Sequence, residues 1–215
     1  ASQRHIFGDA STWAWRLGLL ALVPVMALHL LWLTRMPIVF VDEVWQSNAI
    51  WSWLKTGVNF ELIHHGTLDQ FGMAWLRRPV LGGLPWLAMF GLFGTGLFQA
   101  RLVSLIFGVA LLGLVYGVTA RLYTRGAALL AVLLLSLSIP YTQAAHYARQ
   151  DMMLAVCAFG AFALAYAAIR RGDLRLHFLA GLLMALSVDV HQYGLLLIPG
   201  LAGMYVTHFG RRLLR

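Results

Sequence analysis

The chain contains a series of apolar stretches, each close to the length at which a helix crosses a hydrocarbon layer. Such a helix needs about 20 predominantly apolar residues. The sequence predicts six of them, over residues 13–35, 97–121, 126–143, 152–170, 174–189 and 192–209. Only 11% of the residues are charged, whereas soluble proteins carry about 25%. We therefore predict an all-α, polytopic membrane helical bundle that forms a single transmembrane domain over residues 1–215.

Two further apolar segments, 43–56 and 79–93, lie in the long connection between the first two predicted spans. Both are rich in large apolar side chains, among them Trp45, Trp51 and Trp86. This composition is typical of amphipathic helices that lie in the membrane interface. Anchoring by an aromatic belt would give the same composition, so the sequence leaves both interpretations open.

The arginines predict the orientation of the bundle. If segment 79–93 does not span and the amino terminus is cytoplasmic, ten arginines fall on the cytoplasmic side, as the positive-inside rule expects. They are Arg4, Arg16, Arg121, Arg125, Arg170, Arg171, Arg175, Arg211, Arg212 and Arg215. If the segment did span, the three later clusters would face away from the amino-terminal arginines. We therefore predict both termini in the cytoplasm and an outer loop over about 36–95.

The net charge of +8 does not indicate a nucleic-acid partner, because the basic residues form short clusters between apolar stretches. The single cysteine, Cys157, lies inside an apolar stretch and is interpreted as a helix-packing residue. Membrane lipids and other membrane subunits are the expected partners.

Acidic residues gather on the predicted outer side, although acidic residues have little influence on orientation. The six are Asp42, Glu43, Glu61, Asp69, Asp151 and Asp189. Ionisable groups close to hydrocarbon are costly and indicate functional sites. For Asp42, Glu43 and Asp151, capping of a helix amino terminus is an equally good explanation when each is taken alone.

Several basic and polar residues share this predicted face. Arg77 and Arg78 precede the second interfacial segment, where they would bind lipid headgroups or a phosphate, and His191 follows Asp189 in a tight turn. His64 and His65 are adjacent, so that on a regular element they point to different sides, and we interpret them as polar loop residues. His29, within the first span, is the one feature that favours a small transporter.

Such a set suits chemistry on a lipid-linked phosphate. A carboxylate can accept the proton of an acceptor hydroxyl, and a second carboxylate can hold a divalent cation, for which Asp42 and Asp151 are the candidates. An arginine can form paired hydrogen bonds with a phosphate.

Five short motifs resemble those of GT-C glycosyltransferases, in the branch of the protein O-mannosyltransferases and the lipid A aminoarabinose transferases. They occur in family order around Asp42-Glu43, Arg77-Arg78-Pro79, Ala100-Arg101, Tyr147-Ala-Arg149-Gln-Asp151 and Asp189-Val-His191. The resemblance implies transfer of a sugar from a polyprenyl-phosphate donor to an acceptor outside the cytoplasm, with inversion at the anomeric carbon.

The resemblance also implies roles for single residues. Asp42 is the expected general base, and Asp151, with Glu43, would position the acceptor or a metal. Arg78, in a position where the family often has lysine, would contact the donor phosphate. Arg77, Arg149 and His191 are further candidates for substrate contacts.

Members of this group generally continue for several more spans, so we expect these residues to form an amino-terminal membrane module. A non-catalytic membrane subunit that binds lipid or a partner protein is the alternative function.

Overall fold

The computed structural model describes residues 12–59 and 80–210, and within these ranges every regular element is a helix. The helices are α1 (Thr12–Trp32), α2 (Val41–Thr56), α3 (Val80–Phe93), α4 (Leu97–Leu122), α5 (Arg125–Ser136), α6 (Ile139–His146), α7 (Asp151–Arg171), α8 (Leu174–Val190), the 3-10 helix η2 (Gln192–Leu197) and α9 (Ile198–Phe209). The prediction of an all-α bundle is confirmed.

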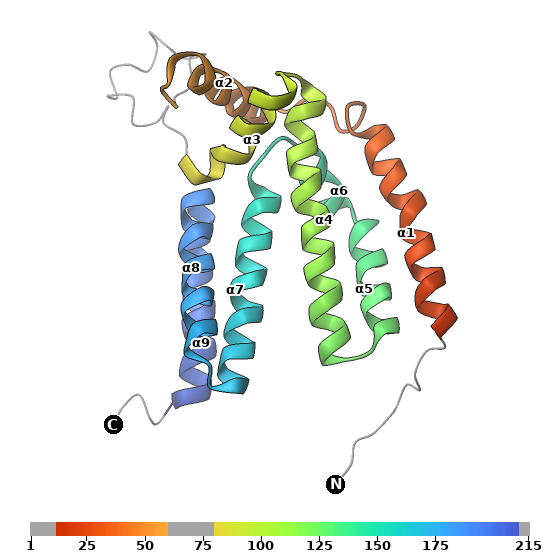
Figure 1. Ribbon diagram of the computed structural model, residues 1–215, viewed down its shortest axis with the longest axis vertical. Coiled ribbons are helices and arrows are strands. Elements are labelled where there is room, and N and C mark those ends of the chain that lie inside the picture. The colour runs from red at the N-terminus through yellow and green to blue at the C-terminus, as the bar shows by residue number, and fades with distance from the viewer. Residues whose placement is uncertain (1–11, 60–79, 211–215) are drawn as a thin grey trace.

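The long helices stand side by side, and the two helices of the first long connection lie across one end of them. Figure 1 shows α1, α4, α5, α7, α8 and α9 roughly upright, with α2 and α3 at the upper end. The α4–α5 and α7–α8 connections lie at the lower end, where α1 begins and α9 ends. Arg121, Arg125, Arg171 and Arg175 therefore share the lower end, away from α2 and α3.

Two of the described helices, α4 and α7, are each long and apolar enough to cross a membrane. A third span is possible by length and composition if α5 and α6, which are bent by 65° at a short break, cross together. The predicted single helix over 126–143 is thus interrupted. Pro140 explains the break, because it lacks the N–H that would continue the helix by bonding the carbonyl of Ser136. Ser138 instead caps α6, its hydroxyl accepting from the Tyr141 N–H at 3.3 Å.

The first helix ends earlier than predicted, at Trp32. His29 consequently lies in the last turn of α1 and not in the middle of the helix.

Small residues allow α7 to approach its neighbours closely. Ala161 and Ala165 of α7 are fully buried in one cluster with Ala180 and Met184 of α8. A Cβ on Gly160 would meet the Leu183 side chain at 3.0 Å, which shows how near α8 lies. Close backbone approach through small residues is the usual packing mode of helices in lipid.

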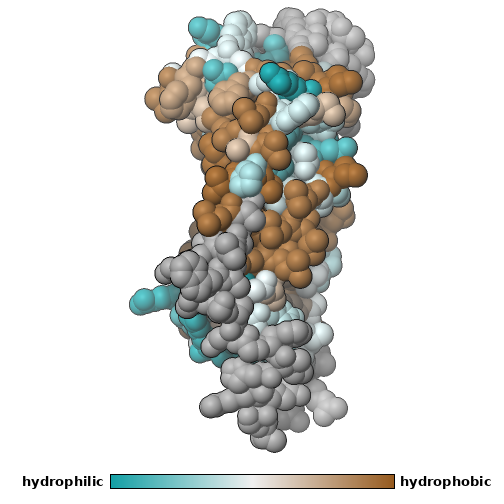
Figure 2. Space-filling model, turned by 90° about the vertical axis from the view of Figure 1, so that its right-hand side faces the viewer, coloured by the Kyte–Doolittle hydropathy of each residue, from teal (hydrophilic) through white to brown (hydrophobic). Residues whose placement is uncertain are grey.

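Apolar side chains also cover the outside of the bundle. Figure 2 shows a largely hydrophobic surface over the middle of the side on which α1 stands in Figure 1. Leu28, Leu31, Leu134 and Leu137 of α1 and the end of α5 are among the exposed residues. A surface of this kind is expected for a helix bundle whose solvent is hydrocarbon.

Candidate active site

The first turn of α2 carries two adjacent carboxylates, Asp42 and Glu43. Successive residues of a helix with 3.6 residues per turn point about 100° apart, so these two side chains leave α2 in different directions. Glu43 closes a capping box at this end of α2, accepting from the Phe40 N–H at 2.9 Å. Glu43 thereby turns towards the bundle, and Asp42 stays at the surface.

Glu43 forms a buried ion pair with Arg101 of α4. The Arg101 Nε and Nη2 groups donate to the two Glu43 carboxylate oxygens, each at 2.8 Å. Glu43 is 2% exposed and Arg101 is fully buried. A paired contact of this geometry is the strongest form of carboxylate–guanidinium interaction.

Further hydrogen bonds complete this pair and connect four segments of the chain. The Ala148 N–H donates to Glu43 Oε1 at 2.8 Å, and Arg101 Nη1 donates to the Leu33 carbonyl at 2.8 Å. The pair thus joins the end of α1, the start of α2, the start of α4 and the α6–α7 connection. Because burying unpaired charges is costly, this network fixes the relative positions of these segments.

Asp42 and Asp151 meet on either side of one arginine. Arg149 Nη2 lies 3.4 Å from Asp42 Oδ2, and Arg149 Nε lies 3.2 Å from Asp151 Oδ2. The three side chains are about one-third exposed, at 34%, 31% and 28% for Asp42, Asp151 and Arg149 respectively. The start of α2 and the start of α7 therefore present two accessible carboxylates around a shared guanidinium. We call these three residues the Asp42–Arg149–Asp151 cluster.

Aromatic rings support Arg149. Its guanidinium carbon lies 5.7 Å from the centre of the Phe40 ring, and the Phe40 and Tyr147 rings are 5.6 Å apart. A cation over an aromatic face is favourable. Residues directly before α2 and α7 thus hold Arg149 between the carboxylates.

Neither carboxylate of the cluster makes a capping hydrogen bond, although both lie in the first turn of their helix, where they complement the macrodipole. Glu43, not Asp42, closes the capping box of α2, and the residue before α7, Gln150, makes no side-chain capping bond. Asp151 is the first residue of α7 and its carboxylate lies beside Arg149. Of the three candidate carboxylates, Glu43 alone makes a capping hydrogen bond among the described residues.

A fourth acidic residue of the upper end, Asp189, contacts the start of α3. Its carboxylate accepts from the Leu81 N–H at 3.0 Å. A Cβ on Gly82 would lie 3.1 Å from the Val190 carbonyl oxygen, so α3 rests directly on the end of α8. His191 forms the N-cap of η2, its Nδ1 accepting from the Tyr193 N–H at 3.2 Å.

The other predicted residues of this region lie outside the described part of the chain. They are Arg77, Arg78, Glu61, Asp69, His64 and His65.

Two buried amides lie beside the cluster. Gln150 Nε2 donates to Gln46 Oε1 at 3.3 Å, and the Gln46 Nε2 group has no hydrogen-bond partner among the described residues. Gln46 is four residues after Asp42, on the same side of α2. Polar side chains therefore extend from the cluster into the bundle.

A cavity of about 490 Å³ lies next to α2. It is lined by Glu43, Ser47 and Asn48 and by residues of the α3–α4 junction such as Gly96. Its volume is within the range of small-molecule sites. Asp42 does not line it, so the cavity and the cluster are neighbouring features of the same end.

The sequence predicted that Asp42 and Asp151 hold a divalent cation. Within residues 12–59 and 80–210, no group of three or more histidine, cysteine or acidic side chains is arranged to hold a metal ion. Asp42 and Asp151 already share Arg149, a cation that occupies the place between them. These residues do not fit a divalent ion while Arg149 is in place.

Arg101, Gln46 and His146 were not predicted from the sequence as separate site residues. Arg101 belongs to one of the motifs, and a lone arginine inside an apolar stretch is itself a signal of a buried partner. Gln46 and His146 carry no comparable signal, because their positions follow from how α2 and α6 dock.

A family model for dolichyl-phosphate-mannose-protein mannosyltransferases matches residues 78–215, which is more than half of the chain. The chain belongs to this family. It is accordingly a membrane protein of the GT-C glycosyltransferase type, as its motifs suggested. The matched segment includes Arg101, Arg149 and Asp151, whereas Asp42 and Glu43 precede it. No curated protein and no solved structure matches the chain significantly.

Proposed function

We propose that this protein transfers a sugar from a polyprenyl-phosphate donor to an acceptor hydroxyl at the end of the bundle formed by α2 and α3. The observation that carries the proposal is the Asp42–Arg149–Asp151 cluster, two accessible carboxylates set around one guanidinium beside a membrane surface. The mannosyltransferase family supports a lipid-linked donor. The positive-inside pattern favours the extracytoplasmic face for this end.

In the proposed reaction, Asp42 accepts the proton of the acceptor hydroxyl. The acceptor oxygen forms a bond to the anomeric carbon of the sugar as the bond from that carbon to the phosphate oxygen breaks. The polyprenyl phosphate leaves with the bonding electrons, and a single displacement of this kind inverts the anomeric centre. No step requires a metal ion.

Asp151 and Arg149 position the reactants. Asp151 lies 3.2 Å from Arg149, and its exposed edge can accept a hydrogen bond from the acceptor. Arg149 contacts both carboxylates and so fixes the position of Asp42, and we assign its remaining N–H groups to the charge that develops on the leaving phosphate. Arg78 is assigned to the donor phosphate on the family resemblance, and His191 and Arg77 are further candidates for contacts there.

The Asp42→Asn variant tests this assignment. Membranes containing the protein are supplied with polyprenyl-phosphate mannose that carries a radiolabel on the sugar, and transfer of label out of the donor is measured. Loss of a general base lowers the rate by about 10²–10⁴-fold, so we expect transfer to fall by that factor. Asp173→Asn is the matched control, because Asp173 caps α8 at the other end of the bundle and asparagine caps equally well.

Equal transfer by wild type and Asp42→Asn would remove Asp42 from the mechanism. Absence of transfer in both, with the protein folded and present, would favour the non-catalytic subunit.

A further inference from the structure

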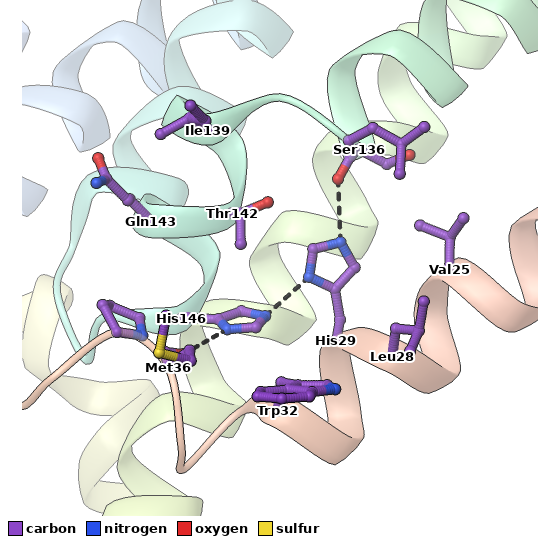
Figure 3. A pocket seen from close by; sticks show the side chains of 12 residues that line it. Val25, Leu28, His29, Trp32, Met36, Ser136, Ile139, Thr142, Gln143 and His146 are labelled. Atoms are coloured by element: carbon purple, nitrogen blue, oxygen red, sulfur yellow. Dashed lines mark hydrogen bonds between the residues drawn. The ribbon is translucent and has the colours of Figure 1, made fainter.

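Two histidines from distant parts of the chain meet between α1 and α6. His29 Nδ1 lies 2.8 Å from His146 Nε2, and both side chains are buried. Their outer nitrogens contact backbone carbonyls: His29 Nε2 lies 3.1 Å from the Ser136 oxygen and His146 Nδ1 lies 2.8 Å from the Met36 oxygen. Figure 3 shows the resulting line of contacts from Ser136 through both rings to Met36.

This line needs more protons than two neutral imidazoles carry. A carbonyl oxygen only accepts, so the contacts to Ser136 and Met36 each require an N–H on the histidine. A neutral imidazole has one N–H, so the two N–H groups of two neutral histidines would both be used on the carbonyls. The two remaining nitrogens would face each other at 2.8 Å as bare lone pairs. A hydrogen bond between them requires a third proton.

We propose that His29 and His146 form a buried proton-binding site, in which the pair holds one proton more than two neutral imidazoles and exists as a hydrogen-bonded imidazole–imidazolium. With this proton all three contacts are hydrogen bonds. Without it, one buried acceptor always loses its donor, whichever tautomers are chosen.

The surroundings of the pair both oppose and support this charge. Burial disfavours a charge on either histidine, and the positive charge of Arg101 on α4 opposes one on His146 as well. The Arg101 charge is neutralised by Glu43 of α2. Tyr141 of α6 meets the His29 ring edge-on, with ring centres 5.6 Å apart, and α5 contributes the Ser136 carbonyl. A cavity of about 450 Å³ borders both histidines, with Thr142 and Gln143 in its wall.

The position of the pair gives the proton a structural effect. Met36 lies in the connection that leads to Asp42, and His146 is the last residue of α6, shortly before Arg149. Ser136 has a free carbonyl because Pro140 cannot bond it. The charged pair therefore links the connection that leads to Asp42 with the end of α6, shortly before Arg149. The proton-binding site does not depend on the proposed function.

The test is a count of protons on the ring nitrogens by ¹⁵N NMR of the histidine-labelled full chain in lipid nanodiscs. The spectrum is recorded at about pH 8, where an ordinary histidine is neutral. Signals of the pair are assigned by their loss in His29→Gln and His146→Gln, and His208→Gln serves as control because His208 is exposed. If a variant does not fold, the pair is assigned in the wild type by nitrogen–nitrogen coupling across the shared proton.

We expect three protons on the four nitrogens of the pair, with a measurable coupling between the two rings. Two unprotonated nitrogens and no coupling would overturn the proposal, because the pair would then consist of two neutral imidazoles.

Discussion

At the scale of single residues, the adjacent carboxylates Asp42 and Glu43 illustrate what the sequence could and could not indicate. The sequence placed both directly before an interfacial helix, and the capping explanation applied to either. Only the docking of α2 on α4 decides which one turns inward, and Glu43 does so to meet Arg101. The pairing depends on a contact between residues 58 positions apart, which no local pattern encodes.

Glu43→Gln should destabilise the fold, because it leaves the Arg101 guanidinium buried without a counter-ion. Breaking a buried ion pair costs about 3–5 kcal/mol, and we expect thermal unfolding in detergent to shift to clearly lower temperature. Asp42→Asn is the matched control, since its partially exposed pair with Arg149 contributes about 1 kcal/mol or less. Similar unfolding temperatures for both variants would contradict the structural role of Glu43.

At the scale of elements, the sequence predicted helix positions well where apolar length alone determines them. The helices predicted at 97–121 and 152–170 are observed as α4 and α7, with bounds that differ by at most one residue. The span predicted at 126–143 is interrupted, although Ser138 and Pro140 are recognisable start signals for a new helix. The prediction gave more weight to the unbroken apolar stretch than to those signals. The observed break leaves the Ser136 carbonyl without a partner in its own helix, and His29 contacts it.

The junction of α8 and η2 offers a test of packing at the element scale. A Cβ on Gly194 would lie 2.5 Å from the Ser187 carbonyl carbon and oxygen, and these backbone atoms cannot rotate away. We expect Gly194→Ala to lower the free energy of unfolding by about 1–3 kcal/mol or more. Because this junction carries Asp189, docking of α3 should weaken as well.

Gly181→Ala is the control for this variant. A Cβ on Gly181 of α8 meets nothing within 4 Å, so this change should be neutral or stabilising by up to about 1 kcal/mol. Thermal unfolding of the two variants in the same detergent gives the comparison, and equal effects would show that η2 does not rest on α8 as described.

At the scale of the whole molecule, the upper end of the bundle collects the chemistry and the lower end collects the arginine-bearing connections. α2, α3 and the starts of α7 and η2 meet at the upper end, and the α4–α5 and α7–α8 connections lie at the other (Figure 1). The sequence predicted this separation from the arginines alone. It could not predict the Asp42–Arg149–Asp151 cluster, because the cluster forms only when α2 lies across the start of α7.

The central claim, that this end of the bundle serves a polyprenyl-phosphate donor, is tested most directly by native mass spectrometry of the protein purified in mild detergent from its own membranes. We predict a bound species with the mass of a polyprenyl phosphate, with or without a sugar. Asp42→Asn should retain that species, because the base contacts the acceptor, and Arg78→Gln should lose most of it, because the phosphate contact is weakened. A protein that carries only ordinary phospholipids, in the wild type as in both variants, would contradict the account.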